Sequence, residues 1–156
     1  MKNTLKLITT IIICQLAGFV GSLFTTPAIP TWYASLVKPA FSPPNWLFAP
    51  VWLSLYTLMG ISLFLIWRQG WSDKRVKSAF ILFLIHLIFN ALWSVLFFGL
   101  QNPLLGLIGI ILLLILIIII IVKFYKINHI AAYLLIPYLL WVSFATLLNL
   151  SFYILN

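Results

Sequence analysis

The chain has almost no acidic side chains: Asp73 is the only one among its 156 residues, and glutamate is absent. This excludes a pair of catalytic carboxylates and a Ser-His-Asp triad within the core. It also removes the buried acid that ion-coupled transporters normally use. The single cysteine, Cys14, excludes an internal disulfide and a cysteine-rich metal site. With no glycine-rich phosphate loop either, we expect no metal and no cofactor.

Charged residues of both signs are scarce, at 6% of the chain, whereas 65% of it is hydrophobic. A soluble domain carries about 25% charged residues, so this surface is suited to lipid rather than water. One spanning helix needs about 20 apolar residues, which allows about five spans in this length. We therefore expect an all-α membrane protein, a bundle of five transmembrane helices that forms a single domain over residues 1–156.

Breaks in the apolar pattern place the helices. They are expected at residues 5–25, 46–67, 78–98, 103–122 and 130–155. The first is longer than the apolar core of a signal peptide, so we interpret it as a retained helix. Residues 26–45 join the first two helices and are rich in aromatic residues and proline. Because proline restricts the backbone, we expect this loop to hold a defined shape and to act as a lid.

The basic residues are distributed unevenly between the two sides that five spans create. One side carries eight of the nine: Lys2, Lys6, Arg68, Lys74, Arg75, Lys77, Lys123 and Lys126. The other side carries only Lys38. The positive-inside rule then predicts a cytoplasmic N-terminus, with the first loop and the C-terminus outside. Since this accounts for the net charge of +8, nucleic acid is not an expected partner.

Aromatic and polar residues share one face on three of the expected helices. At helical spacing they are Trp52 and Tyr56, then His86, Asn90 and Trp93, and finally Trp141, Ala145, Leu148 and Asn149. If these faces converge, they enclose a pocket for a flat, largely apolar ligand that a few polar groups would orient. The alternative is structural: tryptophans as core or interfacial residues, the two asparagines as hydrogen bonds between helices, and His86 as a satisfied interior residue.

Four motifs occur in order along the chain. The first is Trp32-Tyr33-x-x-Leu36-x-Lys38-Pro39-x-Phe41-x-Pro43-Pro44-x-Trp46. The second and third are Val51-Trp52-x-x-x-Tyr56-x-x-Met59-Gly60 and Asn90-x-x-Trp93-x-x-x-Phe97-Phe98-Gly99. The fourth is Pro137-Tyr138-x-x-Trp141-x-x-Phe144-Ala145-x-x-Leu148-Asn149. In order and spacing they resemble the TspO/MBR family of translocator proteins, tryptophan-rich sensory proteins and peripheral-type benzodiazepine receptors.

The resemblance implies a five-helix bundle, often a homodimer, with a pocket under the first loop. That pocket would take porphyrins such as protoporphyrin IX and synthetic ligands of the benzodiazepine and isoquinoline type. By motif position, the ligand-binding residues would be Tyr33, Pro44, Trp52, Tyr56, Asn90, Trp93, Trp141, Ala145 and Leu148. Trp52 and Trp141 resemble the pair tied to light-driven porphyrin breakdown in some bacterial members, and would be the catalytic residues of such an enzyme.

The chain also departs from the family pattern. Tyr153 is followed by Ile154-Leu155-Asn156 and not by a basic residue, so the animal cholesterol motif is incomplete. Gly109 stands among aliphatic residues in a helix where many relatives carry an acid, and the basic tail of animal members is missing. These departures favour a bacterial-type member in a plasma membrane, which agrees with the predicted topology.

Three functions remain open at this point. The chain is a receptor or sensor that regulates tetrapyrrole levels, a light- and oxygen-dependent enzyme that degrades protoporphyrin IX, or a porphyrin transporter. The lack of acid–base groups and of an internal repeat favours the receptor. No GxxxG motif identifies a dimer interface.

Overall fold

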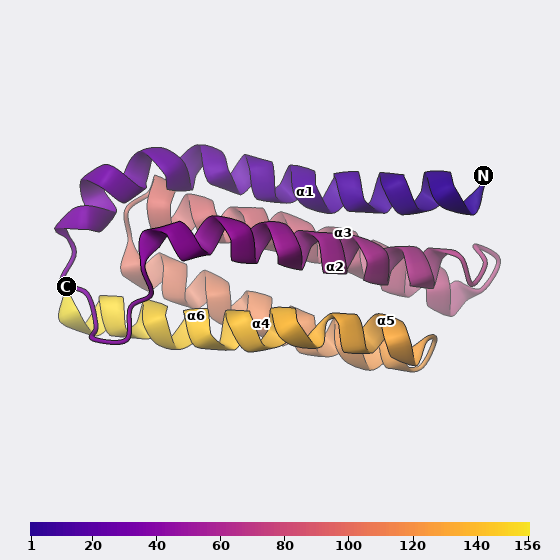
Figure 1. Cartoon of the computed structure of the whole chain (residues 1–156). Coiled ribbons are helices and arrows are strands. Elements are labelled where there is room, and N and C mark those ends of the chain that lie inside the picture. The colour runs from indigo at the N-terminus through magenta and orange to yellow at the C-terminus, as the bar shows by residue number, and fades with distance from the viewer.

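Five helical spans make up the computed structural model, which describes residues 1–156. Each is long and apolar enough to cross a membrane: Asn3–Tyr33, Asn45–Trp67, Lys74–Gly99, Pro103–Tyr125 and His129–Leu155. The spans lie side by side, and the first loop and the C-terminus are at the end opposite the N-terminus (Figure 1). The expected all-α bundle of five transmembrane helices is confirmed.

The first span is longer than expected. Helix α1 (Asn3–Ala28) contains Pro27 and continues through a wider π-helical turn at Ile29–Tyr33. The prediction that the loop begins at residue 26 is therefore wrong, and the irregular connection is confined to residues 36–44. Proline removes a helical hydrogen bond, but membrane helices tolerate it through local π adjustments and neighbouring polar groups. Here the hydroxyl of Thr31 donates to the carbonyl oxygen of Pro27 at 2.9 Å.

The second and third spans begin at local signals. A short 3₁₀ turn at Asn45–Leu47 leads into α2 (Phe48–Trp67). Helix α3 (Lys74–Ser94) begins before the expected residue 78, because the carboxylate of Asp73 caps it by accepting from the backbone N–H of Arg75 at 2.8 Å. A second π-helical turn, Val95–Gly99, ends this span.

The last two spans also differ from their expected limits. Helix α4 (Pro103–Tyr125) is capped by the side chain of Asn102 and runs beyond residue 122. The fifth span is divided into α5 (His129–Leu134) and α6 (Ile136–Leu155). The break falls at Leu135 because Pro137 has no N–H to donate to the preceding turn.

The spans pack in a ring. α1 contacts α2 and α3, α4 contacts α3, α5 and α6, and α2 contacts α5 and α6. α1 and α2 approach closely at Gly60, where an added Cβ would lie 2.6 Å from the Cα of Ile11. Only glycine permits that approach.

The end of the bundle near the N-terminus has a closely packed interior. Met59, Leu63 and Ile66 from α2 are fully buried there, as are Phe83 from α3 and Phe124 from α4. The two phenylalanine rings stack with centroids 5.7 Å apart. The cavity described below lies toward the opposite end, under the first loop.

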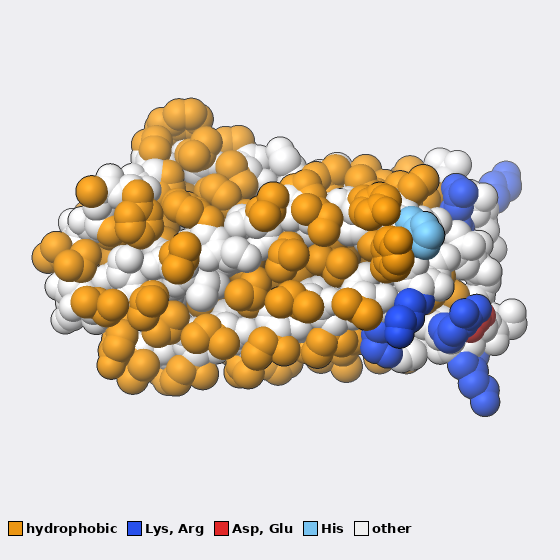
Figure 2. Space-filling model, turned by 90° about the horizontal axis from the view of Figure 1, so that it is seen from below, with side chains coloured by type: hydrophobic (Ala, Val, Ile, Leu, Met, Phe, Trp, Pro, Cys, Tyr) orange, Lys and Arg blue, Asp and Glu red, His pale blue; other side chains and the backbone are white.

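Surface charge also differs between the two ends of the bundle. Lysine and arginine gather at one end, and apolar side chains cover the rest of the face shown in Figure 2. The only acid, Asp73, forms an ion pair there with Arg75 at 2.9 Å, and this guanidinium holds the pKa of the carboxyl below its usual range. The surface is that of a multi-pass membrane protein. The cytoplasmic placement of the basic end stays a prediction.

Candidate ligand-binding cavity

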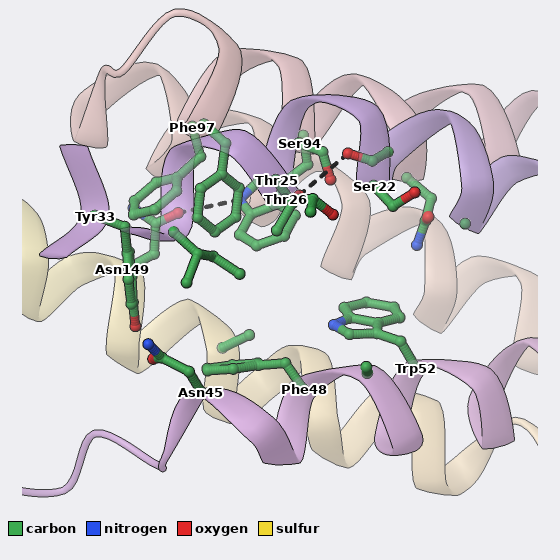
Figure 3. A pocket seen from close by; sticks show the side chains of 18 of the residues that line it. Ser22, Thr25, Thr26, Tyr33, Asn45, Phe48, Trp52, Ser94, Phe97 and Asn149 are labelled. Carbon is green, nitrogen blue, oxygen red and sulfur yellow. Dashed lines mark hydrogen bonds between the residues drawn. The ribbon is translucent and has the colours of Figure 1, made fainter. Parts of the chain in front are cut away.

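A cavity of about 220 Å³ lies between the spans on the side of the first loop. Four of the five spans line it, and α4 contributes no residue. Figure 3 shows its open centre enclosed by aromatic rings, with Tyr33 and Asn45 at one end and Trp52 at the other. The polar and aromatic faces predicted on three helices therefore do converge.

Helix α2 and the turn before it provide one wall. Asn45, Phe48, Ala49, Trp52 and Tyr56 all line the cavity, because three- and four-residue steps return to the same helix face. The rings of Trp52 and Tyr56 stack with centroids 5.4 Å apart. In Figure 3 the indole nitrogen of Trp52 is directed toward the open centre.

Helix α6 provides the facing wall, with Trp141, Ala145 and Leu148. The ring of Trp141 meets Phe48 of α2 edge-on, with centroids 6.0 Å apart. Ala145 is one of the small residues in this wall, and its missing side-chain volume is part of the open space. The two walls thus hold two indole rings against the same space.

Trp93 of α3 is held by hydrogen bonds. Its Nε1 donates to Oδ1 of Asn149 at 3.1 Å, and Nδ2 of Asn149 donates to the carbonyl oxygen of Pro103 at 2.9 Å. Its ring also stacks on Phe97 at 5.8 Å. Asn149 therefore joins three spans, as the structural interpretation of the sequence expected, and it lines the cavity as well.

A buried hydrogen-bond network forms the inner end of the cavity. The hydroxyl of Tyr56 donates to Oδ1 of Asn90, and Nδ2 of Asn90 donates to the hydroxyl oxygen of Tyr138 at 2.9 Å. His86 lies beyond, with Nδ1 3.0 Å from the carbonyl oxygen of Phe83 and Nε2 2.8 Å from the Tyr138 hydroxyl. Since a carbonyl only accepts, Nδ1 carries the hydrogen and Nε2 accepts from Tyr138. His86 is thus a satisfied interior residue.

The first loop crosses the outer end and is held by a few contacts. Oδ1 of Asn156 accepts from the backbone N–H of Val37 at 2.8 Å, and Nδ2 donates to the carbonyl oxygen of Val37 at 3.1 Å. The ring of Phe41 meets Phe144 edge-on at 6.2 Å. No side chain from residues 34–44 lines the cavity, although Tyr33 and Asn45, on either side of this segment, do.

Eight of the nine ligand-binding residues predicted from the sequence line the cavity: Tyr33, Trp52, Tyr56, Asn90, Trp93, Trp141, Ala145 and Leu148. The ninth, Pro44, does not. It is exposed, with an extended backbone that precedes the Asn45–Leu47 turn, so the chain first reaches the cavity at Asn45. The part that the eight residues take in binding stays a prediction.

Sequence reasoning missed the contribution of α1. Gly18, Gly21, Ser22 and Thr25 line the cavity from this helix. Their three- and four-residue spacing was the available signal. Gly18 also permits close packing, because a Cβ there would collide with the ring of Tyr56.

Comparison with known proteins gives a consistent result. The sequence profile of the TspO/MBR family matches residues 10–155. The chain is 50% identical to "Tryptophan-rich protein TspO" of Archaeoglobus fulgidus, over 99% of both chains. It is 43% identical to the protein of the same name from Chlorobaculum tepidum, over 99% of this chain and 98% of that one. It is 37% identical to the "Translocator protein" of Homo sapiens, over 86% of this chain and 80% of the human one. The chain therefore belongs to the TspO/MBR family.

Proposed function

We propose that this protein is a membrane receptor that binds a flat, largely apolar molecule in the cavity, and that it senses or regulates tetrapyrroles such as protoporphyrin IX. Ligands of the benzodiazepine and isoquinoline type would use the same space. The observation that carries the proposal is an aromatic cavity with three tryptophans in its walls. Flat rings stack favourably on such walls, and the indole N–H of Trp52 offers a directional contact.

The cavity must widen to admit a tetrapyrrole. Its volume of about 220 Å³ is below the range of about 300–1,000 Å³ that is typical of sites for drug-sized ligands. The loop of residues 36–44 is held by few contacts, whereas the opposite half of the bundle is filled by buried side chains. We therefore propose that ligands enter from the loop side, which would be the outer face of the plasma membrane.

A titration tests the receptor proposal. Purified protein is titrated with protoporphyrin IX in the dark while tryptophan fluorescence is followed, and saturable quenching is the expected result. Ala145→Phe should fill part of the cavity and weaken binding about tenfold or more, a loss of about 1.4 kcal/mol or more. Leu147→Phe is the matched control, because Leu147 is 61% exposed on the same helix. Absence of saturable quenching by the unmodified protein would contradict the proposal.

One observation favours a second candidate, light-driven degradation of protoporphyrin IX. Trp52 and Trp141 line the same cavity from facing walls. The ring of Trp141 reaches across to α2, where it contacts the ring of Phe48. A bound porphyrin would contact both indoles, which are oxidisable side chains. Molecular oxygen, as the co-substrate, would be the oxidant.

Illumination separates the enzyme from the receptor. In the enzyme, Trp52→Phe and Trp141→Phe should abolish the light-dependent loss of porphyrin absorbance and leave dark binding largely intact. Trp46→Phe is the control, since Trp46 is 71% exposed and does not line the cavity. Equal rates in all three variants and the unmodified protein would exclude the tryptophan mechanism. Porphyrin flux into sealed vesicles would instead support the transporter, for which the packed half of the bundle offers no passage.

A further inference from the structure

Two buried hydroxyl groups near the outer end of the cavity have no hydrogen-bond partner other than each other. Tyr33, which lines the cavity, is 3% exposed, and its hydroxyl is buried. The hydroxyl of Ser42 is also buried and neighbours that of Tyr33. Buried polar groups are rarely left unpaired in native proteins, because losing water without a replacement partner is costly. The pair carries two protons and a bond between the two groups uses one, so at least one donor stays free for an acceptor.

The loop itself brings Ser42 back toward Tyr33. The backbone N–H of Ser42 donates to the carbonyl oxygen of Pro39 at 3.0 Å, which closes a turn. The pairing of Val37 with Asn156 fixes the start of the same segment. These backbone hydrogen bonds therefore hold Ser42 close to Tyr33.

A positive charge lies over the same ring. Nζ of Lys38 is 4.6 Å from the centroid of the Tyr33 ring. Lys38 is the one basic residue that the chain places on this side of the bundle, and it forms no ion pair. The only acidic side chain, Asp73, is at the opposite end and is engaged by Arg75. The lysine therefore has no acidic side chain as a counter-ion.

A hydrogen-bonding side chain continues the polar region into the cavity. Asn45 lines the cavity, and Figure 3 shows the hydroxyl end of Tyr33 directed toward it. At the other end of the cavity lie the aromatic rings of Trp52 and Tyr56. Tyr33 and Asn45 thus make the outer end of the cavity polar, Ser42 and Lys38 lie beside this end just outside the lining, and aromatic rings lie further in.

We propose that the outer end is a carboxylate subsite: the hydroxyls of Tyr33 and Ser42 donate to the carboxylate, and Lys38 supplies the opposite charge. The ligand class that fits is a flat, apolar ring system with a terminal carboxylate, whose rings lie against the tryptophans. This rests on the proposed function, because it assumes that the cavity binds such a ring system. It adds that the acid group of the ligand, and not only its flat surface, is recognised.

Two matched probes test the subsite. Protoporphyrin IX carries free carboxylates, whereas its dimethyl ester has the same ring system without the charge. The readout is the ratio of the two dissociation constants, ester over acid, measured by quenching in the dark. The unmodified protein should prefer the acid about tenfold or more, since hydrogen bonds to charged groups are stronger than those to neutral ones.

Two substitutions should reduce that preference. Tyr33→Phe keeps the ring and removes the buried hydroxyl, so the ratio should fall about tenfold. Lys38→Met removes an exposed charge, so the ratio should fall by about two- to fivefold. At high salt the difference in this ratio between Lys38→Met and the unmodified protein should become smaller. Lys77→Met is the control, because Lys77 is an exposed lysine at the opposite end of the bundle. Binding of the ester should change little in any of them.

The outcomes separate the two proposals. If acid and ester bind the unmodified protein equally, or if Lys38→Met and Lys77→Met lower the ratio alike, the subsite is overturned while the receptor function stands. If neither probe quenches saturably, the receptor function fails and the subsite fails with it. Lys38→Met keeps the test decisive if Tyr33→Phe does not fold, because the lysine side chain is exposed.

Discussion

The hydroxyl of Tyr138 joins two buried side chains that have no other way to complete their hydrogen bonds. It donates to Nε2 of His86 and accepts from Nδ2 of Asn90. Tyr138→Phe should leave both nitrogens unpaired and reduce the free energy of unfolding by about 1–3 kcal/mol. Thermal unfolding in detergent measures this. Tyr153→Phe is the matched control, since Tyr153 is 46% exposed and makes no side-chain hydrogen bond. Equal melting temperatures for the two variants would show that the network contributes no stability.

At the scale of single residues, the sequence predicted those whose position follows from local spacing. Trp52 and Tyr56 repeat on one face of a single helix, so their common direction is visible without the fold. The partner of His86 was not visible, because Tyr138 lies 52 residues away and on another span. Pro44 was assigned by motif position alone, and motif position does not show which way the chain turns at Asn45.

Among the elements, the contact of α1 with α2 depends on Gly60. Gly60→Ala would place a Cβ 2.6 Å from the backbone of Ile11, which cannot move without displacing the helix. We expect a loss of about 1–3 kcal/mol in stability, again measured by thermal unfolding. Gly109→Ala is a milder change, because its Cβ would be too close only to the terminal Cδ1 of Leu96, at 2.9 Å, and a side chain can rotate away. Similar losses in both variants would argue against a backbone contact.

The start of α3 provides a prediction about pH. Arg75 lowers the pKa of Asp73, so the carboxylate cap contributes stability above the ordinary carboxyl pKa of about 3.9, and this contribution is lost as the pH falls through the lowered value. The backbone amide resonance of Arg75 should therefore titrate below pH 3.9. In Arg75→Gln the midpoint should rise toward the ordinary value. An unchanged midpoint would show that the ion pair has no effect on this cap.

Apolar length and basic flanks located all five spans, because both reflect the thickness of the membrane and its surface. The irregular features inside the spans were not predicted. The π-helical turn at Ile29–Tyr33 continues a helix through Pro27 and Pro30, where proline usually indicates a loop. The break at Leu135 was likewise not predicted, although Pro137 is a local signal for it. Whether a membrane helix continues past a proline, as at Pro27, or breaks there depends on neighbouring spans, which a local pattern does not contain.

Viewed as a whole, the molecule carries its basic residues at one end, which predicts its orientation in the membrane. Single cysteines at Ala40 and Lys126 should behave oppositely toward a membrane-impermeant maleimide in intact cells. Ala40→Cys in the first loop should be labelled at once, and Lys126→Cys only after the membrane is permeabilised. Cys14 is fully buried and should remain silent in both. The reverse labelling pattern would invert the predicted topology. Homodimer formation stays a prediction, which the mass of the purified protein in detergent would test.

The pairing of Asn156 with the backbone of Val37 has a consequence for kinetics. A ligand that enters from the loop side must wait for these two hydrogen bonds to open. The observed association rate should then stop rising at high ligand concentration and level off at the opening rate of the loop. Asn156→Ala should raise that plateau, and it should speed dissociation as well, because the same opening releases the ligand. Residence time would thus depend on a side chain that does not line the cavity.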